Sequence, residues 1–103
     1  MSEFGWTSSG LKAADGVISA GAGKLGGVLV ISDGTNAVNL IIYDNASAAS
    51  GTKLAEITIG ASPATGALSQ GVWFGDKGLT ALNGLYADVT QATGTIKFYV
   101  FYG

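Results

Sequence analysis

The sequence predicts an all-β protein: an antiparallel β-sandwich or jelly roll of seven to eight short strands. Three observations support this fold class. Segments rich in β-branched and aromatic residues recur at roughly 8–12-residue spacing, as in sandwiches and jelly rolls. Glycine-rich turns separate these segments, and the chain contains 17 glycines. Poor helix formers interrupt every window long enough to hold a helix.

The clearest predicted hairpin joins residues 28–31 to residues 38–43. Asp33 and Gly34 lie between the two apolar runs, and the glycine supplies the positive φ that a tight turn needs. Alternate residues of a strand point to opposite faces, which places Val38, Leu40 and Ile42 on one face and Asn39, Ile41 and Tyr43 on the other. Both faces are partly apolar, so we expect an inner strand.

Further strands are predicted at residues 52–59, 68–74, 84–90 and 95–102, and Pro63 lies in a turn-rich connection that should be exposed. The last strand has aromatic residues on both faces, with Ile96, Phe98, Val100 and Tyr102 on one and Lys97, Tyr99 and Phe101 on the other. One face can fill the core, whereas the other needs cover from a neighbouring element or another subunit. Tyr99 and Phe101 are therefore candidate partner-binding residues.

A chain of 103 residues fits one domain. We expect an N-terminal arm over residues 1–15 and a β-sandwich domain over residues 16–103. The arm is polar apart from a few apolar side chains, among them Phe4 and Trp6. A tryptophan supplies a large area for burial, so these two aromatic residues suggest that the arm docks, and both are candidate partner-binding residues.

The composition limits the classes of partner. Hydrophobic residues make up 48% of the chain and charged residues 12%, where an ordinary domain has roughly 25% charged residues. A surface with so few charged residues costs little free energy to desolvate, which favours contact with another protein. The net charge is -2 and the five cations are scattered lysines, which argues against nucleic-acid binding. We expect no membrane span and no secretion signal, because no apolar stretch approaches roughly 20 residues.

The chain lacks the side chains that most enzymes use. It contains no histidine and no cysteine, which removes the commonest general base and the strong zinc ligands. Residues 21–26 fit the string GxGxxG, but the following residues favour a strand where a nucleotide-binding fold needs a helix. Most aspartates fall at predicted turns, where they commonly cap. We therefore expect no enzyme activity, no cofactor and no metal.

Carbohydrate binding is the alternative function that the residues leave open. Trp6, Trp73 and Tyr86 could form a platform on which a sugar ring stacks. Aromatic side chains of this kind more often belong to a core or to a protein interface. A carbohydrate-binding module is therefore the alternative function.

Several motifs together resemble small virion proteins of tailed bacteriophages. The resemblance spans about residues 16–102. Its motifs are a glycine-led strand at residues 16–18, a "LxIYDNxSAASG"-like segment at residues 40–51, and a final "GLYxxxT…GTxxFxY"-like hairpin at residues 84–102.

The resemblance implies a β-sandwich that decorates or cements a capsid. It implies the major capsid protein as the partner, a position on the capsid surface of the virion after synthesis in the host cytoplasm, and self-association as a trimer or dimer on a local symmetry axis. The expected function is thus structural, because a cement protein must bind neighbouring subunits and needs no chemistry. The alternative within the same resemblance is a carbohydrate-binding or host-attachment module of a phage fibre or tail protein.

Overall fold

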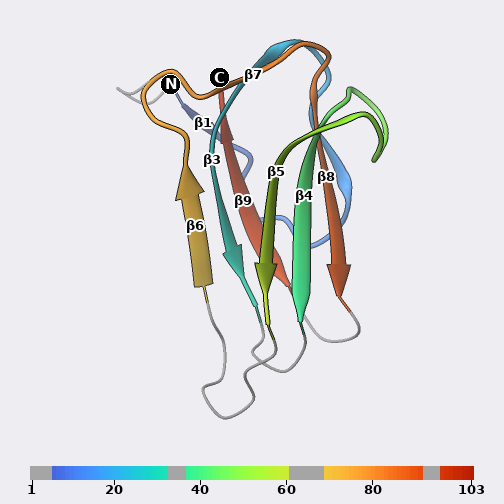
Figure 1. The fold of residues 1–103 in the computed structure, drawn as a ribbon, viewed down its shortest axis with the longest axis vertical. Coiled ribbons are helices and arrows are strands. Elements are labelled where there is room, and N and C mark those ends of the chain that lie inside the picture. The colour runs from blue at the N-terminus through green and yellow to red at the C-terminus, as the bar shows by residue number, and fades with distance from the viewer. Residues whose placement is uncertain (1–5, 33–36, 61–68, 92–95) are drawn as a thin grey trace.

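The structure is a computed structural model that describes residues 6–32, 37–60, 69–91 and 96–103. These residues form strands and no helix. The strands are β1 (Thr7–Ser8), β2 (Gly16–Ser19), β3 (Gly23–Ile31), β4 (Val38–Asp44), β5 (Thr52–Ile59), β6 (Ser69–Trp73), β7 (Leu79–Ala81), β8 (Leu85–Gln91) and β9 (Lys97–Tyr102) (Figure 1).

Two antiparallel sheets pack face to face, which confirms the predicted all-β sandwich. Sheet A has the order β1-β9-β3-β6, with β7 pairing one end of β3, and sheet B has the order β2-β8-β4-β5. The chain crosses from one sheet to the other at most connections. This alternation gives the described strands the connectivity of a jelly roll.

The core lies between the two sheets and is aliphatic apart from Phe98. Alternation on β4 places Val38, Leu40 and Ile42 in the core, as predicted. On β9, Ile96, Phe98 and Val100 are buried in the core and Tyr102 packs against it, which is also the predicted face. β4 lies between β5 and β8, so it is the inner strand that its two apolar faces indicated.

The predicted hairpin of residues 28–43 is wrong. β3 pairs with β6, β7 and β9, whereas β4 pairs with β5 and β8. The two strands belong to different sheets and face each other across the core, where Val28 and Val30 of β3 and Leu40 of β4 are all buried. Burial of both apolar faces outweighs the local turn signal. The Asp33-Gly34 step lies outside the described residues.

The final hairpin that the resemblance suggested is wrong for the same reason. β8 lies in sheet B and β9 in sheet A, so the two consecutive strands do not pair. β4 and β5, by contrast, are consecutive and pair from Val38–Ile59 to Asp44–Thr52, with an irregularity in register opposite Ile42 and Tyr43.

Asp44 and Asn45 form hydrogen bonds around the end of β4. Both lie in the motif at residues 40–51 that resembles small virion proteins. Asp44 is buried, and its carboxylate accepts hydrogen bonds from the backbone N–H groups of Leu82, Asn83 and Gly84 at 3.0, 2.8 and 3.4 Å. The side-chain oxygen of Asn45 accepts from the N–H groups at residues 47 and 48, both at 2.9 Å. Asp44 therefore ties the end of β4 to the start of β8.

The N-terminal residues line the edge of sheet A. Thr7 and Ser8 pair with Tyr102 and Phe101 of β9, and Lys12 forms a backbone bridge to Phe98. The first described residues and the end of the chain therefore lie side by side at one end of the sandwich (Figure 1).

Candidate binding surface

The outer face of sheet A carries aromatic side chains that lie outside the core, among them Tyr99 and Phe101. Tyr99 and Phe101 alternate with the buried Phe98 and Val100 on β9, so they point away from the core. Both are half-buried, and neither packs against the core cluster. Their rings stack, with centroids 6.4 Å apart and an angle of 16° between the planes.

Trp73 extends this surface across β3. Gly27 of β3 lies between Trp73 of β6 and Phe101 of β9 in the register of the sheet. A Cβ atom at Gly27 would lie 2.4 Å from Cε3 of Trp73, which means that the indole covers the glycine. The Trp73 and Phe101 ring centroids are 5.1 Å apart, with the rings tilted by 34°. Trp73 nevertheless remains 62% exposed, so one side of its ring is open to a partner.

Trp6 covers the neighbouring glycine. A Cβ at Gly26 would lie 2.5 Å from Cδ2 of Trp6, and one at Gly78 would lie 2.7 Å from its Cη2. The register of β3 against β9 shifts between Leu25 and Gly27, so Gly26 lies at a bulge. The indole of Trp6 packs against this glycine. The glycines of the GxGxxG-like string thus accommodate two tryptophans.

We call this surface the aromatic face and define it by Trp6, Leu29, Trp73, Tyr99 and Phe101. Leu29 joins it because its register partners are Tyr99 and Gly71. Among the described residues, the strands of sheet A carry Lys24 and Lys97 as their only charged residues, whereas four acidic residues, including Asp44 and Glu56, lie on or beside sheet B. The strands that carry the aromatic face are therefore poor in charge.

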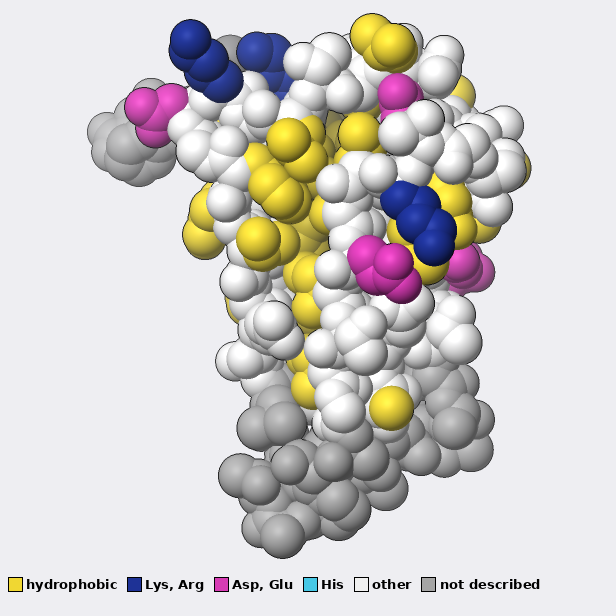
Figure 2. Space-filling model, viewed as in Figure 1, with side chains coloured by type: hydrophobic (Ala, Val, Ile, Leu, Met, Phe, Trp, Pro, Cys, Tyr) yellow, Lys and Arg dark blue, Asp and Glu magenta, His cyan; other side chains and the backbone are white. Residues whose placement is uncertain are grey.

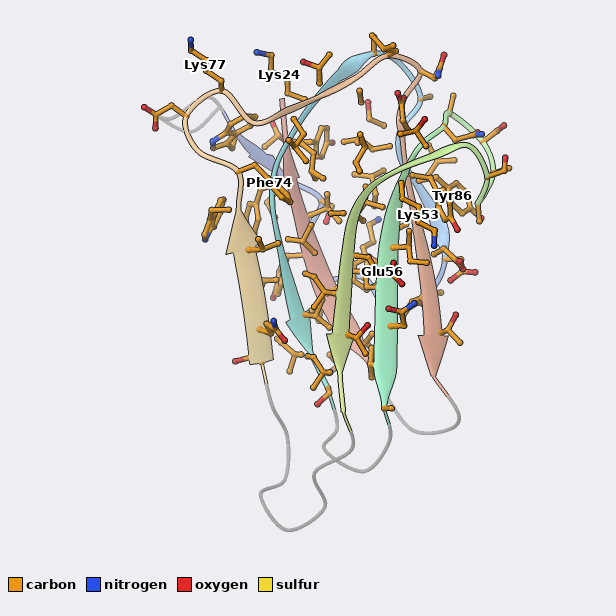
Figure 3. The ribbon with its side chains drawn as sticks, viewed as in Figure 1. Lys24, Lys53, Glu56, Phe74, Lys77 and Tyr86 are labelled. Atoms are coloured by element: carbon orange, nitrogen blue, oxygen red, sulfur yellow. The ribbon has the colours of Figure 1, made fainter. Side chains whose placement is uncertain are left out.

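The outer face of sheet B is polar by comparison. Asn39 donates from its side-chain amide to Glu56 at 3.0 Å and accepts from the Thr58 hydroxyl at 2.8 Å. Lys53 pairs with Glu56 at 3.7 Å, and Tyr86 of β8 lies on the same sheet (Figure 3). Tyr86 is thus on a different sheet from Trp73, so the three aromatic residues considered for sugar stacking do not form one platform.

Two of the described acidic residues, Asp15 and Asp88, interact where β2 meets β8. Burial first, and then the charge and hydrogen bonding of the Asp15 carboxylate, raise the pKa of Asp88 above its ordinary value. Asp15 accepts a hydrogen bond from the N–H of Val89 at 2.7 Å, which holds the start of β2 against β8. Across the part of the chain that the structure describes, no three acidic, histidine or cysteine side chains gather as metal ligands, and no helix is suited to cross a membrane.

The structure brings together three of the four candidate residues. Tyr99 and Phe101 lie on the outer side of β9 and Trp6 covers Gly26 of the neighbouring β3, while Phe4 lies outside the described residues. From the sequence, Trp73 is a candidate only for sugar stacking, and its place beside Phe101 is not indicated. The unbroken apolar run at residues 28–31 has no polar alternation, which indicates that side chains cover both faces of that strand.

The chain was compared with protein-family models, with curated proteins and with solved structures, and none of the three comparisons gives a match. Function therefore has to be inferred from the aromatic face and from the chemistry of the residues.

Proposed function

We propose that this protein is a non-enzymatic structural module that docks on another protein through the aromatic face of sheet A. The observation that carries the proposal is the row Trp73, Gly27, Phe101, in which a large indole packs against Gly27 and stays 62% exposed. Tryptophan, tyrosine and phenylalanine are enriched at the centre of protein interfaces. An indole that is already fixed against glycine loses little conformational freedom on binding.

A capsid decoration or cement protein is the class that fits this surface best. Such a protein must bind shell subunits tightly and needs no chemistry of its own. The low charge of sheet A favours a partner surface that is also apolar, and the motifs at residues 16–18 and 40–51 add the resemblance to small virion proteins. The proposed partner is the major capsid protein of a tailed bacteriophage, and the proposed location is the outer surface of the virion.

Co-sedimentation with empty shells tests this proposal. The shells are assembled from the major capsid protein encoded in the same genome as this chain, and the purified protein is added over a range of concentrations. We expect saturable binding that Trp73→Ala weakens by about tenfold or more, since truncation of a central interface aromatic costs about 2 kcal/mol.

Tyr86→Ala is the matched control, because it removes an aromatic side chain from the outer face of sheet B. Its affinity for shells should equal that of the unaltered protein. Absence of shell binding by the unaltered protein, or equal losses in the two variants, would contradict the proposal.

Carbohydrate binding remains a second candidate because the exposed ring of Trp73 offers a surface for stacking a sugar. A glycan array probed with the unaltered protein and with Trp73→Ala separates the two candidates. Binding to glycans that Trp73→Ala abolishes, with no binding to shells, would replace the docking proposal with the sugar-binding one.

A further inference from the structure

One edge of sheet A has backbone groups directed away from the rest of the sheet. The N–H of Phe74 donates to the carbonyl of Gly26 at 3.1 Å, which marks a hydrogen-bonded pair of β6 and β3. Such pairs alternate along an antiparallel ladder. The N–H and C=O groups of Ser69, Gly71 and Trp73 therefore point away from β3. No strand among the described residues pairs with this side of β6.

The other edge strands carry features that discourage pairing with another chain, and β6 does not. β5 has Lys53 and Glu56 on its outer face and an irregular register against β4. β2 has four residues with a register shift, and β1 has two residues. Charges, bulges and short length are the usual protections of an edge. β6 has five residues in continuous register with β3, and none of its side chains is charged.

An apolar strip lies beside this edge. Hydrophobic side chains run down the molecule between β6 and β5, where sheet B leaves the inner side of sheet A partly uncovered (Figure 2). The half-buried residues that pack against the core from these edges and from β7 are Leu54, Ala55, Val72, Phe74 and Leu79. A strand added to β6 would remove part of this strip from water as well as pairing the free backbone.

We infer that a second copy of this chain pairs with β6, antiparallel and across a two-fold axis at Gly71. In this register Gly71 lies opposite Gly71 of the partner subunit, and Ser69 lies opposite Trp73 of the partner subunit. The backbone N–H and C=O groups of Ser69, Gly71 and Trp73, which point away from β3, then form hydrogen-bonded pairs with the second copy, about six bonds in total. Sheet A continues through the axis into the sheet A of the second copy.

A second copy fits this edge because the strand is compatible with itself. The residue on the axis meets its own copy, and glycine brings no side chain there. The residue opposite the large Trp73 is the small Ser69 of the partner subunit. Since β6 carries no charged side chain, pairing two copies of this strand places no like charges opposite each other within it. The dimer uses the edge of sheet A, so this inference does not rest on the docking function proposed for its outer face.

Sedimentation velocity of the full chain over a wide concentration range tests the inference. We expect a monomer–dimer equilibrium, and Gly71→Lys should raise the dimer dissociation constant by about tenfold or more. A Cβ at Gly71 has only ordinary contacts of 3.4 Å or more within its own chain, so the substitution is compatible with the fold. Thr90→Lys is the control, because it adds the same charge to an exposed position on β8, an inner strand of sheet B, and should leave the constant unchanged.

Hydrogen exchange of the unaltered protein gives a measurement that needs no variant. The amides of Gly71 and Trp73 should exchange slowly at concentrations where the dimer forms and rapidly on dilution. The amide of Val72, which faces β3, should be protected at both concentrations. A monomer at every concentration, a trimer, a dimer that Gly71→Lys leaves intact, or fast exchange of Gly71 in the dimer would each overturn the inference.

Discussion

Gly26, Gly27 and Gly84 are among the glycines at which another part of the molecule occupies the space of a side chain. Gly26 and Gly27 lie beneath indole rings, which can move aside. Gly84 is different, because a Cβ there would lie 2.6 Å from the carbonyl oxygen of Ser19 and 2.8 Å from the Cα of Ala46, both of which are backbone atoms. The close approach of these segments therefore depends on the absence of a side chain at residue 84.

Gly84→Ala should destabilise the protein by about 1–3 kcal/mol, the usual cost of forcing an extra carbon into a packed site. Chemical denaturation followed by circular dichroism measures the change. Gly21→Ala is the matched control, since a Cβ at Gly21 meets nothing within 4 Å. Equal stabilities of the two variants would show that the backbone near Gly84 relaxes freely.

Gly27→Ala should change the aromatic face while leaving the fold intact. The new methyl group would displace the Trp73 indole and separate it from Phe101. In a Trp6→Phe background, the near-ultraviolet circular dichroism of the remaining tryptophan should weaken, and shell binding should weaken with it. Gly16→Ala, at a strand position with open space around it, should alter neither signal. An unchanged spectrum for Gly27→Ala would mean that the indole is not fixed on this glycine.

At the scale of single elements, the sequence predicts what each strand buries better than it predicts which strands pair. The core faces of β4 and β9 follow from local alternation, which the sequence displays directly. The pairing of β3 with β6 and β9 depends on residues about 40 to 70 positions away, so no local turn signal reports it. Likewise, the role of Gly27 depends on Trp73, which is distant in sequence.

Asp44 links the end of β4 to the start of β8 through hydrogen bonds. Because its carboxylate is ionised, the stability that this link provides should depend on pH. Hydrogen bonds from the backbone N–H of Asn83, then of Leu82 and Gly84, lower the pKa of Asp44 below its ordinary value, although burial opposes the shift. A carboxyl group with a lowered pKa in the folded state stabilises the protein above its unfolded pKa. That contribution is lost as the pH falls through the lowered folded value.

Asp44→Asn should therefore lower the midpoint of thermal unfolding by several degrees at pH 7, because the charged acceptor is gone. The difference between the variant and the unaltered protein should begin to narrow below about pH 4, where the carboxyl of the unfolded chain takes up a proton, and should disappear as the pH falls through the lowered pKa of the folded state. Thermal melts recorded at a series of pH values provide the measurement. A difference that stays constant down to about pH 2 would contradict the role assigned to the ionised carboxylate.

At the scale of the whole molecule, the two sheets divide the tasks of the protein. Sheet A carries the aromatic face and lysines as its only charges within the described strands, and sheet B carries the hydrogen-bonded acidic residues. Composition predicted a low-charge, protein-binding surface. It could not predict that the aromatic residues would gather on one side, because that requires the order β1-β9-β3-β6.

Truncation at the two ends should have unequal effects. A chain that lacks residues 1–8 loses β1 at an edge of sheet A together with the cover of Trp6, and should stay folded with a loss of about 1–3 kcal/mol. A chain that ends at residue 91 loses β9, which lies between β1 and β3, along with buried Phe98 and Val100. We expect it to be unfolded by circular dichroism, and a folded product would refute this account of the core.

The positions of β8 and β9 also bear on the time at which folding can happen during synthesis. Among the described strands, β8 and β9 come last in the chain, and both are inner strands, β9 in sheet A and β8 in sheet B. Until both have been synthesised, β2 lacks the one described strand that pairs with it, and β3 lacks its partner on one side. Neither sheet can therefore be completed before β8 and β9 leave the ribosome, and the sandwich should close only after both have emerged.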